Sequence, residues 1–151
     1  MKRLRLLVVL GVIAVALPLG LTTAHATGGG GSYPANWVGI NYYAQYDLNG
    51  NIVHLGLNVR CKDVGLGVPL GNGEVSGSIS QEPPQTPYPT VVNIGANSVV
   101  CDGKTHAVGL SVQGVGLDAG LAKATVTLVP PVGGGSPVTT TARINIVVMN
   151  P

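Results

Sequence analysis

The two cysteines, Cys61 and Cys101, are the first residues whose types could support chemistry. The chain has no C-x-x-C motif, and neither His54 nor His106 stands at metal-ligand spacing beside a cysteine. A redox or metal-binding pair is therefore disfavoured. In an exported chain a single pair of cysteines favours a structural disulfide. Closing a loop of this length stabilises a fold by roughly 3–4 kcal/mol in the chain-entropy model.

Two pairs of residues have types that acid–base catalysis uses. Asp102 and His106 lie four positions apart, and a serine beside them would complete a nucleophilic triad. However, His106 shares the apolar face of its segment, Asp102 precedes a turn glycine, and no Gly-x-Ser-x-Gly elbow is present. Glu74 and Glu82, the only glutamates, would need to stand about 5–10 Å apart to cleave a glycosidic bond. A strand end separates them, so we expect structural or solvated acids and no enzymatic activity.

The segment 47–51 (DLNGN) has residue types found in calcium-binding loops. A loop of that kind carries glycine at its sixth position and a bidentate glutamate at its twelfth. Here glycine comes fourth and Asn58 occupies the twelfth position. Asn49-Gly50 is instead typical of a hairpin turn, because both residues tolerate positive φ. We therefore expect neither a metal nor a cofactor.

Three aromatic residues, Trp37, Tyr43 and Tyr88, are the best candidates for ligand binding. Trp37 and Tyr43 fall on the more polar face of the first predicted strand. Exposed aromatic rings spaced along a strand can stack on sugar rings or anchor a protein partner. Tyr88, in a proline-rich loop, would extend that surface. The alternative is that the two strand faces are reversed, or that the rings cover loops.

Residues 1–26 have the organisation of a secretory signal peptide. A basic start (KRLR) precedes an apolar run at 6–21, and Ala24-His25-Ala26 is a small-x-small cleavage site. The apolar run is shorter than the roughly 20 residues of a spanning helix, which disfavours a permanent anchor. We therefore expect a secreted, extracellular protein with no membrane span after cleavage.

The charge balance changes once this peptide is removed. The whole chain has a formal charge of +2, but three of its eight basic residues lie in the signal peptide, leaving five against six acids. The remaining chain carries no cluster of Lys and Arg, so nucleic-acid binding and polybasic attachment to a membrane surface are not expected. With 45% hydrophobic and 9% charged residues, a folded domain is favoured over a disordered chain or a helical bundle.

Alternation of apolar and polar residues with period two indicates strands throughout the rest of the chain. In the first strand we expect Val38, Ile40, Tyr42, Ala44 and Tyr46 to face inward. The predicted strands are 37–46, 52–61, 74–80, 91–94, 98–101, 105–112, 122–129 and 139–149.

Two segments are predicted to lack regular structure. Residues 27–35 (TGGGGSYPA) form a flexible glycine-rich lead-in. Residues 81–89 (QEPPQTPYP) form an exposed, extended loop, because prolines lack the amide donors of a central strand.

Residues 36–151 are therefore predicted to form one all-β domain. About seven strands with polar and apolar faces favour an immunoglobulin-like antiparallel β-sandwich with one disulfide. A small closed barrel is the alternative.

Half of the chain resembles small secreted actinobacterial proteins. The matching segments are a Cys-Asp-Gly turn feeding a strand, a Gly-x-Ala-x-Ala segment opening the next, and an upstream strand end: 100–108 (VCDGKTHAV), 110–112 (LSV), 119–126 (AGLAKATV) and 77–81 (GSISQ). The resemblance implies an immunoglobulin-like sandwich and no established activity. Unlike a true immunoglobulin domain, the chain places its one tryptophan, Trp37, before both cysteines.

These observations predict an exported, non-enzymatic binding module that recognises an extracellular protein or polysaccharide. A small secreted protease inhibitor presenting the 81–89 loop, or a small hydrolase using His106, is one alternative. A self-assembling structural protein is another, because the uncharged strand at 144–149 would favour edge pairing unless it is covered.

Overall fold

The computed structural model of the chain describes residues 34–63 and 71–149. The predicted signal peptide, residues 1–26, and nearly all of the lead-in at 27–35 lie outside the described residues. The described residues form strands and turns without a helix, so none of them forms a helix that could cross a membrane.

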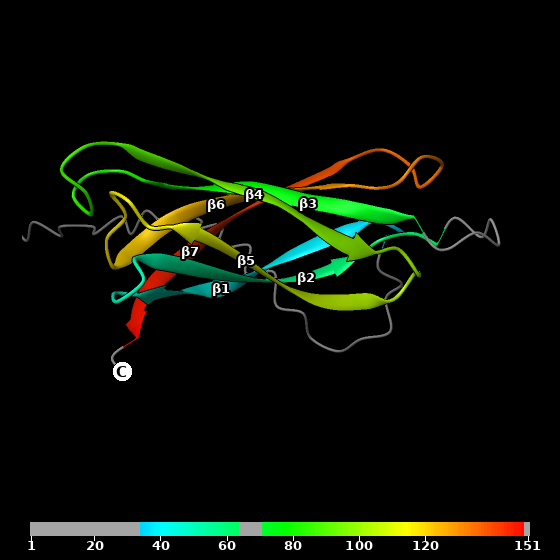
Figure 1. Ribbon diagram of the computed structural model, residues 1–151. Helices are drawn as coiled ribbons and strands as arrows, with labels where there is room; N and C mark the ends of the chain where they lie inside the picture. The colour runs from blue at the N-terminus through cyan, green and yellow to red at the C-terminus, as the bar shows by residue number, and fades with distance from the viewer. Residues whose placement is uncertain (1–33, 64–70, 150–151) are drawn as a thin grey trace, which may run out of the picture. The chain divides into compact units, whose positions relative to one another are not determined.

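The structure confirms the predicted all-β architecture. The strands are β1 (Trp37–Asp47), β2 (Ile52–Arg60), β3 (Asn72–Gln81), β4 (Thr90–Val100), β5 (Thr105–Gln113), β6 (Gly120–Val129) and β7 (Val138–Met149) (Figure 1). The two short strands predicted at 91–94 and 98–101 are one strand, β4. Its register against β3 shifts between Val75 and Gly77, and this bulge interrupts the alternation on which the prediction depended.

The seven strands form one hydrogen-bonded sheet in the order β4-β3-β6-β7-β1-β2-β5. The sheet is mixed, because β1 and β7 pair in parallel, Tyr43 opposite Asn145 through Asp47 opposite Met149. The expectation of a purely antiparallel arrangement is therefore wrong. β7 lies between β6 and β1, so it is not an edge strand, although residues 147–149 pair with β1 alone.

The sheet is barrel-like and curls around a single core. Figure 1 shows β3 and β4 lying across from β2 and β5. The edge strands β4 and β5 approach closely enough for the Asn97 amide to donate a hydrogen bond to the Gly109 carbonyl, 3.2 Å away. The predicted inward faces of β2, β3, β6 and β7 supply most of the core, including Leu55, Leu57, Ile79, Val126, Leu128, Ile144 and Ile146. Burial of such side chains stabilises a fold by about 1.5–3 kcal/mol each.

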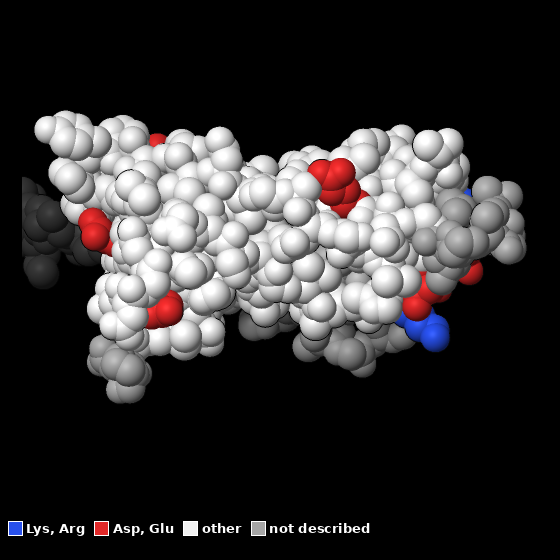
Figure 2. Space-filling view, viewed as in Figure 1, with Lys and Arg blue, Asp and Glu red and all other residues white. Residues whose placement is uncertain are grey.

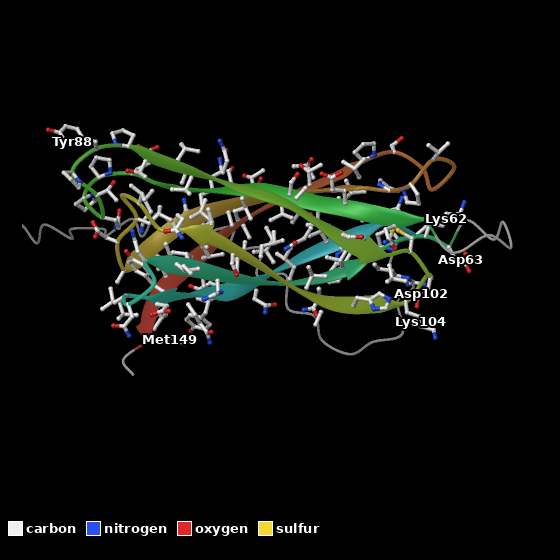
Figure 3. The ribbon with its side chains drawn as sticks, viewed as in Figure 1. Lys62, Asp63, Tyr88, Asp102, Lys104 and Met149 are labelled. Carbon is white, nitrogen blue, oxygen red and sulfur yellow. A yellow bond between two sulfur atoms is a disulfide. The ribbon has the colours of Figure 1, made fainter. Side chains whose placement is uncertain are left out.

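The predicted disulfide between Cys61 and Cys101 is present, with an S–S distance of 2.03 Å and a Cα–Cα distance of 4.5 Å. It joins the residue after β2 to the residue after β4, and both cysteines are fully buried. The Gly103 amide donates to the Cys61 carbonyl at 2.9 Å. In Figure 3, the labelled residues Lys62 and Asp102 lie at this end of the domain, whereas Tyr88 and Met149 lie at the other.

The loop after β3 is held more tightly than predicted. Gln81 is 1% exposed; its amide donates to the carbonyls of Asp118 and Leu121 at 2.9 and 3.2 Å, and its side-chain oxygen accepts from the Asp118 amide at 2.8 Å. Thr86 is also buried and donates to the Tyr88 carbonyl at 2.6 Å. The loop begins one residue later than predicted, because Gln81 ends β3. Residues 82–84 and 87–89 are exposed as expected, whereas Thr86 is buried.

Candidate functional site

A β-bulge in β1 breaks the alternation of its side chains. Ile40 pairs with Leu57 and Ala44 with Leu55, so residues 41–43 stand opposite Gly56 alone. Extra residues in one strand turn successive side chains to the same face. The bulge lies where β1, already paired with β2, also begins to pair with β7.

The bulge exposes two adjacent tyrosines. Tyr42 is 60% exposed and Tyr43 is 58% exposed. Their rings meet edge to face, with centroids 4.9 Å apart and an interplanar angle of 84°, a favoured geometry for aromatic pairs. The prediction that Tyr42 faces the core is therefore wrong. Tyr43 lies on the outer face of the sheet, as its alternation predicted.

Beside these rings lies an open groove on the outer face of β1, β2 and β5, with a volume of about 590 Å³. Two glycines, Gly56 and Gly109, face one another across the β2–β5 pair and help to line it. A Cβ on Gly56 would clash with the Asn41 side chain, whereas a Cβ on Gly109 would meet no atom within 4 Å. The missing side chains therefore leave the hollow, and Asn41 already occupies part of the space above Gly56.

Polar, uncharged groups complete the groove. His54 Nδ1 and Ser111 Oγ are 2.8 Å apart and share a hydrogen bond across β2 and β5. Asn58, which does not line the groove, donates from Nδ2 to Asn41 Oδ1 at 3.4 Å. Gln45 also lines the groove. Apart from the ionisable His54, no residue lining the groove is charged.

The predicted aromatic residues occupy two separate regions. Trp37 and Tyr43 both belong to β1, and a Cβ on Gly39 would come within 2.5 Å of the Trp37 ring. The indole therefore covers Gly39, and Trp37 does not line the groove. Tyr88, 77% exposed, lies on the β3–β4 loop and does not line the groove. The exposure of Tyr42 was not predicted, because alternation does not reveal a bulge. The glycines at positions 56 and 109 were the local signal of a hollow in the sheet.

The described residues do not assemble the nucleophilic triad considered above. His106 Nε2 and Asp102 Oδ1 are 2.8 Å apart. The histidine that contacts a serine is His54, whose partner Ser111 lies five positions farther along β5 than His106. At about 3.4 Å per residue the two pairs are separated by roughly 17 Å, too far for a shared reaction.

The Asp102–His106 contact has an electrostatic consequence. The hydrogen bond from His106 lowers the pKa of Asp102 below its ordinary value, and the Lys104 backbone amide, 2.9 Å from the same carboxylate, lowers it further. Both donors favour the ionised carboxylate. The pair closes the turn beside the disulfide.

The other acids occupy structural or separated positions. Asp47 Oδ1 accepts from the Asn49 amide at 2.9 Å, and the turn at 48–51 confirms the predicted hairpin. The positive φ, 51°, falls on Asn51 rather than on Asn49 or Gly50, so the expected two-residue turn is wrong. Glu74 lies near the start of β3 and Glu82 follows its last residue, so roughly 25 Å of strand separates them. Within residues 34–63 and 71–149, no three His, Cys, Asp or Glu side chains gather as a metal site would require.

Comparison with known proteins leaves the site to be interpreted from its own chemistry. No protein-family model matches the chain, and no curated protein matches it.

Proposed function

We propose that this chain is an exported, non-enzymatic binding module whose ligand occupies the groove beside Tyr42 and Tyr43. The observation that carries the proposal is the β1 bulge, which presents two neighbouring rings to solvent beside a floor lined by glycines. Exposed tyrosines contribute large contact area at low conformational cost. A sheet of ordinary alternation would bury one of the two.

Export is supported by the N-terminal sequence and by the disulfide. Residues 1–26 have the three regions of a signal peptide, and disulfides persist in oxidising compartments. N-terminal sequencing of the protein recovered from culture medium tests this part. The expected mature chain begins at Thr27; an intact N-terminus on a cell-bound protein would contradict it.

An immunoglobulin-like sandwich is supported by the order of strand pairing. β1, β2 and β5 pair as the A, B and E strands do, while β3, β6 and β7 pair as C, F and G do. β4 differs from the D strand of a constant-type domain, because it pairs with β3 rather than β5. The parallel β1–β7 pair links the two groups of strands.

A binding assay with matched variants tests the proposed site. Immobilised cell-envelope polysaccharides and purified envelope proteins are incubated with the wild type, with Y42A/Y43A, and with Tyr88→Ala. We expect the double variant to lose binding and Tyr88→Ala to retain it, with all three proteins showing the same melting temperature. Binding that survives the double substitution would refute the assignment of the groove.

The β3–β4 loop supports a second candidate, a protease inhibitor. Gln81 anchors its base through three hydrogen bonds, and Tyr88 is exposed beyond it. A rigid exposed loop is what an inhibitor must present to a protease. Replacing residues 82–89 by a glycine-serine linker would relieve inhibition across a protease panel. If each protease is equally active with the wild type, with the linker variant and with no added protein, the inhibitor role is excluded.

A further inference from the structure

We infer that the ligand of the groove is an uncharged polysaccharide chain, an inference that rests on the proposed binding function. The groove joins exposed aromatic rings to polar groups without formal charge. Sugar rings combine apolar C–H faces with hydroxyl edges, so they need both kinds of contact. The aromatic rings can stack on the C–H faces, and the polar groups can hydrogen-bond the hydroxyl edges.

The polar groups match hydroxyl partners rather than charged ones. The side-chain amides of Asn41 and Gln45 each offer donors and an acceptor, and the Ser111 hydroxyl can do both. A sugar hydroxyl also donates and accepts, so it can pair with any of them. A carboxylate, sulfate or phosphate ligand would call for Arg or Lys beside it, and neither lines the groove.

The face of the molecule drawn in Figure 2 is also poor in cationic charge, and its basic side chains appear only near one end. No cationic patch on this face would attract a polyanion.

The backbone around the groove disfavours an extended peptide as ligand. A peptide that adds a strand needs a free sheet edge, but β2 is paired on both sides, with β1 and β5. β5 borders the groove at a sheet edge, yet its Gly109 carbonyl already accepts a hydrogen bond from Asn97. The floor also lacks an apolar pocket for an anchoring side chain, because glycine occupies both central positions.

The dimensions favour a short stretch of a chain. A volume of about 590 Å³ lies within the roughly 300–1,000 Å³ range of small-ligand sites. A folded partner would instead bury about 800 Å² on each side. Trp37 lies six positions before Tyr43 on the same strand, at most about 20 Å away. Trp37 does not line the groove, so its ring would contact only a ligand long enough to extend past the groove along β1, as a chain of several sugar units would.

Affinity electrophoresis and calorimetry with defined probes test the inference. The probes are neutral β-glucans, neutral glucan oligosaccharides of increasing length, the anionic polysaccharides alginate and heparin, and a random peptide library. We expect binding to a neutral glycan, affinity that rises with oligosaccharide length, and no change between low and high salt, since screening acts on charges. Tyr43→Ala should weaken this binding about tenfold, and Tyr88→Ala should leave it unchanged.

The outcomes separate this inference from the proposed function. If only an anionic glycan or a peptide binds, and Tyr43→Ala abolishes that binding, the ligand class is wrong while the groove remains the binding site. Neutral-glycan binding that is insensitive to Tyr43→Ala would refute the groove. Failure to bind any of the four classes would overturn both the inference and the proposed function.

Discussion

Filling the floor of the groove at Gly109 separates ligand binding from stability. A Cβ at Gly109 would meet no atom within 4 Å, and its φ lies outside the left-handed region that glycine alone favours. Gly109→Val therefore introduces a β-branched side chain into β5 without a clash. The new methyl groups would rise beside Gly56 on the floor of the groove, into the space that the ligand is proposed to occupy.

The two consequences have opposite signs. Removing glycine from a strand interior stabilises the fold by about 0.5–1 kcal/mol, and valine suits a strand. For a domain of this size we expect the melting temperature to rise by about 2–5 °C. Ligand affinity should fall about tenfold or more. A sugar ring that valine displaces from the floor of the groove loses its stacking on the tyrosines and its hydrogen bonds.

Gly95→Val is the matched control. Gly95 lies in β4, and a Cβ there also meets no atom within 4 Å. Gly95 falls in the β4 bulge, so the control tests binding alone, and we expect binding unchanged from wild type, measured by affinity electrophoresis. Gly109→Val protein that melts at or above the wild-type temperature and binds with wild-type affinity would refute the reasoning.

Three further predictions concern stability. The double substitution Cys61→Ser and Cys101→Ser should lower the free energy of unfolding by about 3–4 kcal/mol, measured by urea titration. Asp102 contributes stability above its unfolded-state pKa, which is lost as pH falls through the lowered folded-state pKa; Asp102→Asn should therefore flatten the acid limb of the stability–pH profile. Gln81→Ala should cost about 2–4 kcal/mol in urea titration, since it removes three hydrogen bonds made by a buried side chain.

Each of these has a contrary outcome. Wild-type protein under reducing conditions should match the cysteine double variant, and equal stability of all forms would contradict the disulfide estimate. If the stability–pH profile of the wild type is no steeper at acid pH than that of Asp102→Asn, the stabilising role of the Asp102–His106 contact is refuted. For Gln81, the control is Gln113→Ala at an exposed position of β5, expected within 0.5 kcal/mol of wild type; equal effects would contradict the anchoring role.

Most strands and most of the core were predictable because each depends on local alternation. In β6, Ala122, Ala124, Val126 and Leu128 are buried, as their spacing indicated. The same local information failed at bulges. Residues 41–43 and the interruption of β4 contain extra residues whose accommodation depends on the partner strand.

Long-range relations were the other part that alternation could not supply. The pairing of β7 with β1 joins residues about a hundred positions apart, and the anchoring of Gln81 joins the end of β3 to the 118–121 segment. Neither contact leaves a periodic trace in the chain. The predicted disulfide could be anticipated only because Cys61 and Cys101 allow a single pairing.

By itself, the sequence determined most of the strands and their inward faces, the disulfide and the hairpin between β1 and β2, because side-chain direction in a strand alternates and turn residues act locally. The tertiary structure alone decided that Tyr42 joins Tyr43 outside, and that Gly56 and Gly109 lie opposite one another as part of a groove. These features arise from register between strands, and register is set by the packing of the whole sheet rather than by any one segment.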